Sequence, residues 1–181
     1  MKFSPTPLAG AFVIDVEPVA DERGFFARSF CVEELKNQRL SMNVLQCSIS
    51  SNNKAGTLRG LHFQAEPQGE EKIVRCTSGA LYDVIVDIRR MSSTYGRWFG
   101  IELSSDNHRS LFIPRGFAHG FVTLAAATEV FYMISTAFVP SLARGLRWDD
   151  PAVAISWPLA PVIMSERDAN LPRLADLAQD N

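Results

Sequence analysis

The stretch KIVRCTSGALYDVIVDIRR, residues 72–90, contains the pattern that decides the fold. Two apolar segments rich in β-branched residues flank TSG (77–79), whose composition is typical of a turn. In the second segment, two alternating sets of residues differ in polarity: Tyr82, Val84, Val86 and Ile88 in one, and Asp83, Ile85 and Asp87 in the other. Because successive side chains of a strand point to opposite faces, the stretch predicts two strands, the second with one face packed in a core and one partly polar face.

Similar short apolar segments, bounded by turn residues, cover most of the chain. They are GAFVIDVEPV (10–19), RWFGIELSS (97–105), SLFIPRGFAHGFVTLA (110–125) and TEVFYMISTAFV (128–139). Helical patterns are confined to CVEELKNQRL (31–40) and a tail around LPRLADLAQ (171–179). Many strands with few helices predict a β-sandwich or closed barrel, and for 181 residues we expect an all-β jelly-roll barrel with a few short peripheral helices. We expect residues 1–181 to form a single domain, because no linker or repeat divides them.

Composition argues against several classes of partner. Lys and Arg total 18 and Asp and Glu total 20, so net charge gives no reason to bind nucleic acid or an anionic membrane. The start of the chain contains Pro5 and Pro7 and no apolar stretch of signal-peptide length, and no later segment is long enough to span a bilayer. Cys31, Cys47 and Cys76 are widely spaced, which predicts buried or half-buried free thiols rather than disulfides or a zinc site. We expect a cytoplasmic protein without nucleic-acid or membrane partners.

The three histidines differ in their surroundings. His108 lies in the polar run SSDNHRS and is typical of a solvated loop, whereas His62 and His119 adjoin apolar, glycine-containing segments. PRGFAH (114–119) has the P-x-G-x-x-H spacing of the second half of the cupin motif, which refines the expected fold to a cupin-type barrel. Metal-binding cupins also carry an H-x-H, but here the stretch is HFQ, with Gln64 in place of the second imidazole. Two histidines are too few ligands for a metal, so we expect metal-free acid–base chemistry without a cofactor.

The whole chain, from DERGFF (21–26) to SERDANLP (165–172), resembles the dTDP-4-dehydrorhamnose 3,5-epimerase family, whose members act on nucleoside-diphosphate 4-keto-6-deoxy sugars. The resemblance is carried by an ordered set of motifs: DERGFF, LRGLHFQ, KIVRCTSGALYDVIVDIR, YGRWFGIELSSDN, FIPRGFAHGFVTL, VFY, RWDDPAVAISWP and SERD. It implies an isomerase of deoxysugar biosynthesis that works as a homodimer. The implied reaction removes a proton next to the C4 ketone and returns one from the opposite face.

The resemblance also implies a role for particular residues. His62 is the base, Asp168 orients and stabilises its ring, and Tyr132 is the acid across the cavity. Lys72 stabilises the enolate oxygen. Substrate contacts are implied for residues that hold the nucleotide, its phosphates or the sugar: Arg23, Phe26, Gln46, Arg59, Gln64, His119 and Arg167. Arg23 and Phe26 are implied to serve the site of the partner subunit, and Arg59 to meet the diphosphate, for which its planar fork is suited.

The residues themselves also permit plainer roles. An arginine such as Arg59 is by default a surface charge, Tyr132 on a strand is usually core, and Asp168 suits a turn cap. A cupin that only binds a sugar nucleotide is therefore a rival, and a cupin dioxygenase a more distant one. A binder, however, has no need of an acid and a base together.

The sequence departs from the family pattern at a set of positions around the implied pocket. They are Arg28 in place of a glutamate, Cys47 and Ser48 in place of Asp-Asn, Ala137 and Phe138 in place of Tyr-Tyr, and Ala143 in place of a glutamate. Because a pocket that loses hydrogen-bonding groups changes its selectivity, we expect CDP or GDP rather than dTDP as the nucleotide. The missing hydroxyl of Phe138 suggests inversion at only one carbon, C3 or C5.

Overall fold

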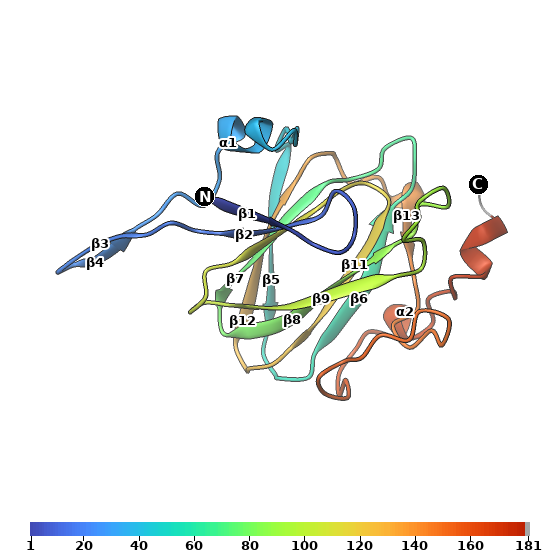
Figure 1. Ribbon diagram of the computed structural model, residues 1–181. Coiled ribbons are helices and arrows are strands. Elements are labelled where there is room, and N and C mark those ends of the chain that lie inside the picture. Colours follow the sequence, from blue (N-terminus) through green and yellow to red (C-terminus); the bar gives the residue numbers. More distant parts are fainter. Residues whose placement is uncertain (180–181) are drawn as a thin grey trace.

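The computed structural model describes residues 1–179 and is built from two antiparallel sheets packed face to face (Figure 1). The six-stranded sheet has the spatial order β1 (Lys2–Pro5), β2 (Phe12–Asp15), β10 (Ser110–Ile113), β7 (Lys72–Ser78), β12 (Thr128–Ile134) and β5 (Gln46–Asn52). The five-stranded sheet has the order β13 (Ala143–Gly145), β6 (Leu58–Gln64), β11 (Phe117–Thr123), β8 (Ala80–Asp87) and β9 (Trp98–Ser104). The predicted cupin-type jelly roll is confirmed. Of the predicted domain over 1–181, residues 180 and 181 lie outside the described residues.

The main core lies between the two sheets. Its members are apolar residues of the inner faces, among them Val74, Leu81, Ile85, Leu111, Phe121 and Val130, each at most 1% exposed. The predicted turn at 77–79 is confirmed, since β7 ends at Ser78, β8 begins at Ala80 and Gly79 has a φ of +73°. Gly79 also leaves no room for a Cβ, which would lie 2.6 Å from Thr128 Oγ1.

Strand β8 is buried on both faces, whereas one partly polar face was expected. The even-numbered residues Val84 and Val86 face a second core on the outside of the five-stranded sheet, which the C-terminal segment covers with Leu146, Val153 and Leu174. The odd-numbered Asp83 and Asp87 are 0% exposed. The alternation was predicted correctly, but hydrogen bonds inside the protein offset the cost of burying both carboxylates. The partner of Asp83 is His119, and the partners of Asp87 are Arg89, Ser92 and Thr94.

The described helices are short and peripheral, as expected. The predicted helix at 31–40 is α1 (Val32–Asn37), and the predicted tail helix is only the 3-10 turn η2 (Asp176–Gln179). A further 3-10 turn is η1 (Pro140–Leu142), and α2 (Glu166–Ala169) was not predicted. The Ser165 hydroxyl caps α2 by accepting a hydrogen bond from Asp168 N at 3.0 Å, a pattern visible in the sequence as SERD. Within residues 1–179, no helix is long and apolar enough to cross a membrane.

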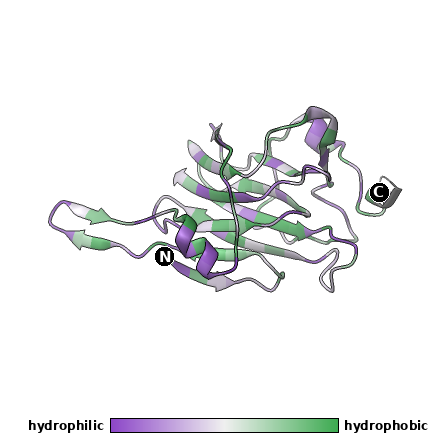
Figure 2. Ribbon diagram, turned by 90° about the horizontal axis from the view of Figure 1, so that it is seen from above, coloured by the Kyte–Doolittle hydropathy of each residue, from purple (hydrophilic) through white to green (hydrophobic). Residues whose placement is uncertain are grey.

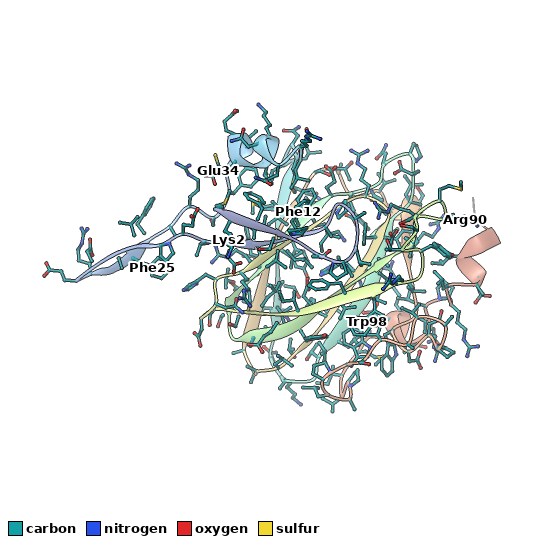
Figure 3. All side chains as sticks on the ribbon, viewed as in Figure 1. Lys2, Phe12, Phe25, Glu34, Arg90 and Trp98 are labelled. Atoms are coloured by element: carbon teal, nitrogen blue, oxygen red, sulfur yellow. The ribbon has the colours of Figure 1, made fainter. Side chains whose placement is uncertain are left out.

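A two-stranded hairpin, β3 (Val19–Asp21) and β4 (Gly24–Phe26), extends away from the barrel (Figure 1). Apolar side chains on it are exposed to solvent: Val19 by 74%, Phe25 by 50% and Phe26 by 81%. Figure 2 shows apolar residues along its strands and hydrophilic residues at its tip. Figure 3 shows Phe25 on the hairpin, and its ring stands edge-on to that of His108 with 4.9 Å between the ring centroids. Exposed apolar residues gathered on one projecting element are typical of a surface that contacts another protein.

Candidate active site

His62 lies on β6 with its imidazole directed to the inside of the barrel. Its neighbours Leu61 and Phe63 pack into the outer core, as alternation along a strand requires. His62 Nε2 lies 2.7 Å from Asp168 Oδ1, and the side chains are 39% and 7% exposed. The predicted histidine–carboxylate pair is thus brought together across more than a hundred residues of sequence, with the imidazole still open to a ligand.

Two glycines allow β6 and β11 to approach closely at this point. A Cβ on Gly60 would lie 2.6 Å from Gly120 Cα, and Gly60 has a φ of +116°, which disfavours any other residue. Gly60 N also donates to the second carboxylate oxygen of Asp168 at 3.1 Å. The same approach places His62 opposite His119 in the strand register.

Asp168 has the protonation state that the partner of a base requires. Its burial by itself would raise the pKa of the carboxyl, but the hydrogen bond and charge of His62, together with the Gly60 N–H, outweigh burial and hold the pKa below its usual value. The carboxylate is therefore ionised at neutral pH. An ionised carboxylate fixes the imidazole ring and stabilises it once it has taken up a proton.

The opposite wall of the barrel is formed by the six-stranded sheet, which carries Tyr132 on β12 and Lys72 on β7. A cavity of about 300 Å³ lies between the sheets. Its lining is formed by Ser48, Ile49, Ser50, Arg59, His62, Lys72, His119, Phe121, Tyr132 and Ile134. The imidazole of His62 and the phenol of Tyr132 thus line one void from two different sheets.

Tyr132 is held as a protonated phenol. Burial and the nearby charge of Asp83 raise its pKa, and the charge of Arg59 opposes them only in part. The ring of His119 stands edge-on to it, with 6.1 Å between the ring centroids. His119 itself is 4% exposed, and its Nε2 lies 2.7 Å from Asp83 Oδ1. The ring of His119, for which a ligand contact was predicted, is thus held by a carboxylate on β8.

A second lobe of about 170 Å³ adjoins the first and shares His62 and Lys72 with it. Its other lining residues are Phe63, Gln64, Glu70, Phe138, Ala143, Arg144 and Arg167. Lys72 is 8% exposed, and its Nζ lies 2.7 Å from Glu70 Oε1. Sequence reasoning missed Glu70, although residues two apart in an extended segment point the same way, and EEK places a carboxylate two positions before the lysine.

Three further predicted binding residues, Arg59, Gln46 and Gln64, differ in their surroundings. Arg59 lines the first lobe and donates from Nε to Asn52 Oδ1 at 2.8 Å, which fixes its guanidinium at the rim. Gln46 begins β5 and pairs with Ile134. The Gln64 amide is occupied by the main chain: its nitrogen donates to Gln68 O and Ala137 O, and its oxygen accepts from Val139 N.

The two remaining predicted residues lie on the hairpin, and the structure does not bring them to this chain's own cavity. Arg23 pairs with Asp21 at the hairpin tip and is 83% exposed. Phe26 is also exposed and lines a separate hollow at the base of the hairpin with Arg75 and His108.

The structure shows the surroundings of four departures from the family pattern: Arg28, Ser48, Phe138 and Cys47. Arg28 donates to Glu34 Oε1 at 2.8 Å, so the reversed charge has a partner on α1. Ser48 lines the first lobe and Phe138 the second, where each presents fewer hydrogen-bonding groups than the residue it replaces. Cys47 is exposed on the edge strand β5, whereas a buried or half-buried thiol was expected.

The fold and the site together define a class: a jelly-roll protein with a histidine–carboxylate pair and a protonated phenol on facing walls of a ligand-sized cavity. Such groups can remove a proton from one face of a carbon atom and return a proton to the other.

Comparison with known proteins agrees with this class. The family model described as dTDP-4-dehydrorhamnose 3,5-epimerase matches residues 5–176. The dTDP-4-dehydrorhamnose 3,5-epimerase of Sinorhizobium fredii is 41% identical over 178 residues, covering 98% of this chain and 91% of that protein. The Bacillus anthracis enzyme, crystallised with TDP and PPi, has a TM-score of 0.92 at 39% identity, covering 95% of this chain and 98% of that one. The Legionella pneumophila dTDP-6-deoxy-D-glucose-3,5-epimerase, in complex with dTDP-4-keto-L-rhamnose, has a TM-score of 0.91 at 35% identity, covering 96% and 93%.

The chain therefore belongs to the dTDP-4-dehydrorhamnose 3,5-epimerase family. It is an isomerase that epimerises a nucleoside-diphosphate 4-keto-6-deoxy sugar.

Proposed function

We propose that the protein inverts the configuration of a carbon atom next to the C4 ketone of a dTDP-linked 4-keto-6-deoxy hexose, with His62 as base and Tyr132 as acid. The observation that carries this proposal is that the two rings line one cavity from opposite sheets. Inversion requires this arrangement, because the proton must leave one face of the carbon and return to the other.

The proton transfers follow from the contacts of each group. His62 takes the proton from carbon and becomes an imidazolium beside the Asp168 carboxylate at 2.7 Å. The electron pair moves onto the ketone oxygen, where the Lys72 ammonium offsets the enolate charge. Tyr132 then gives its proton to the opposite face of the carbon, and exchange with water restores both side chains. The raised pKa of Tyr132 suits this role, since the phenol keeps its proton until a strongly basic carbon accepts it.

Incubation with dTDP-4-keto-6-deoxyglucose in heavy water, followed by NMR, tests the reaction. The wild type is expected to incorporate deuterium at the inverted carbon, and His62→Ala to lose exchange while still binding dTDP. If the wild type bound the sugar nucleotide without any deuterium exchange, the proposed enzymatic function would be refuted, and the rival interpretation of a non-catalytic cupin would be favoured.

The nucleotide is proposed to be dTDP, because TDP and dTDP-4-keto-L-rhamnose occupy the related structures named above. The earlier expectation of CDP or GDP rested partly on Arg28, whose ion pair with Glu34 supplies another reason for that residue. Calorimetric titration with dTDP, CDP and GDP distinguishes the three. Tighter binding of CDP or GDP would show that the changes at Cys47 and Ser48 have altered base selection.

A single-carbon reaction is the second candidate, and Phe138 favours it. Its ring lines the second lobe next to His62 and Lys72 without offering a hydroxyl. The heavy-water experiment decides the question: label at C3 or C5 alone supports this candidate, and label at both carbons refutes it.

We also propose that the working form is a homodimer in which Arg23 and Phe26 of each subunit complete the partner's site. Support comes from the hairpin, whose exposed apolar residues project from the barrel and do not reach this chain's own cavity. Mixing a His62→Ala protein with an Arg23→Ala/Phe26→Ala protein tests this arrangement. If the hairpin acts on the partner, a statistical mixture regains about a quarter of wild-type activity, because each heterodimer contains one intact site. No recovery over either variant alone, once subunit exchange is verified, would contradict it.

A cytoplasmic location and a single domain over residues 1–181 belong to the same proposal. Three free cysteines fit a reducing compartment. The family model extends over residues 5–176, which fits one folding unit. Limited proteolysis checks the latter, since a second unit would be released by cleavage at an internal linker.

A further inference from the structure

One carboxylate in the cavity has no part in the reaction described above. Glu70 Oε1 lies 2.7 Å from Lys72 Nζ, and the two side chains are 15% and 11% exposed. Lys72 lines both lobes of the cavity, whereas Glu70 lines only the second. Separating two charges in such a place leaves one of them uncompensated, so the pair fixes the position of the ammonium.

Glu70 itself belongs to a loop that is anchored on both sides. Before it, the Gln64 amide donates to Gln68 O at 2.7 Å, and after it Glu71 N donates to Ser135 Oγ at 2.9 Å. The Glu70 carboxylate therefore belongs to a segment of main chain that hydrogen bonds fix on both sides. The lysine, by contrast, is a compact charge on a flexible four-carbon stem with three N–H donors.

We propose that Glu70 is a positioning residue for epimerisation. It accepts one N–H of the Lys72 ammonium from the side of the second lobe, and this contact holds the ammonium where its other donors face the enolate oxygen. This inference rests on the proposed role of Lys72. Its energetic basis is preorganisation, because a charge already in place does not have to be ordered when the enolate forms.

A double-mutant cycle tests the proposal, with kcat and KM measured for Glu70→Ala, Lys72→Ala and the double variant. Glu70→Ala is expected to lower kcat about tenfold while KM changes less than about threefold, since the contact matters mainly in the transition state. Glu70→Gln is expected to retain most of the activity, because its amide oxygen accepts the same hydrogen bond. In the Lys72→Ala background, Glu70→Ala is expected to cause no further loss.

The matched control is Glu71→Ala, on the same loop, whose carboxylate interacts with Ser135 and Arg115; it is expected to keep wild-type kcat. Equal fold-losses from Glu70→Ala with and without Lys72 would overturn the proposal, because they would show a role that does not act through the lysine. Equal defects in Glu70→Gln and Glu70→Ala would overturn it as well. Neither outcome touches the proposed function, which fails only if the wild type shows no exchange at all.

Discussion

Asp87→Asn is expected to weaken the fold in a way that depends on pH. Asp87 ends β8, is 0% exposed, and accepts hydrogen bonds from Arg89 Nη2 at 2.7 Å, Ser92 Oγ at 2.6 Å and Thr94 Oγ1 at 2.6 Å. Burial alone would raise the pKa of this carboxyl, but these donors outweigh it and lower the pKa from 3.8 to about 2. The ionised carboxylate therefore closes the loop between β8 and β9.

The size of the effect follows from this pKa. One pKa unit corresponds to about 1.4 kcal/mol, so the shift is worth about 2 kcal/mol of unfolding free energy at neutral pH. Because the folded-state pKa is depressed, this stability is fully present above the unfolded pKa of 3.8 and is lost as the pH falls through about 2. About 1 kcal/mol of it should be gone at pH 3.

Urea unfolding of the wild type and Asp87→Asn, followed by tryptophan fluorescence at pH 7 and pH 3, measures the effect. We expect a difference in unfolding free energy of about 2 kcal/mol at pH 7 that shrinks by about 1 kcal/mol at pH 3. Asp106→Asn, a change at an exposed aspartate, serves as the control and should show no such dependence. An equally large difference for Asp87→Asn at both pH values would show that the charge is not the source.

Three further changes test the site. Tyr132→Phe should still exchange deuterium through His62 but lose inversion by about 10²–10⁴-fold, and full inversion by this variant would eliminate the phenol as acid. Asp168→Asn should lower kcat by a similar factor with dTDP binding retained, as calorimetry can check. Gly60→Ala, whose Cβ would meet Gly120 Cα at 2.6 Å, should lower the unfolding free energy by about 2 kcal/mol or more; an unchanged urea midpoint would contradict the close approach.

Sequence patterns predicted the strands well because a strand with alternating side chains carries its own signature. The turn at Gly79, the segments around β10 to β12 and the shortness of the helices all followed from local composition. Two features were misjudged for different reasons. Helix α2 has a local cap at Ser165, but its four residues are too few to show a helical period. Both faces of β8 are buried because the C-terminal segment, which is distant in sequence, covers the outer one.

The candidate site was predicted unevenly for the same reason. His62, Tyr132, Asp168 and Lys72 were identified through motif resemblance. In the structure, His62, Tyr132 and Lys72 line the cavity, and Asp168 pairs with His62. Glu70 was missed because an acidic residue in a loop looks like any solvated charge until its partner is known. The substrate contact expected of Gln64 stays a prediction: its amide donors are bonded to Gln68 O, four residues along the chain, and to Ala137 O, which only the fold brings near.

By itself, the sequence determined what depends on near neighbours: strand periodicity, the turn glycine, and the presence of a histidine, a phenol, a carboxylate and a lysine in family order. Tertiary structure alone decided which of these groups meet. The His62–Asp168 pair joins residues 106 apart in sequence, and the facing of His62 and Tyr132 depends on two sheets closing over one cavity. Alternation predicts only the face of the strand on which a side chain lies, whereas the packing of the sheets determines which residues that face contacts.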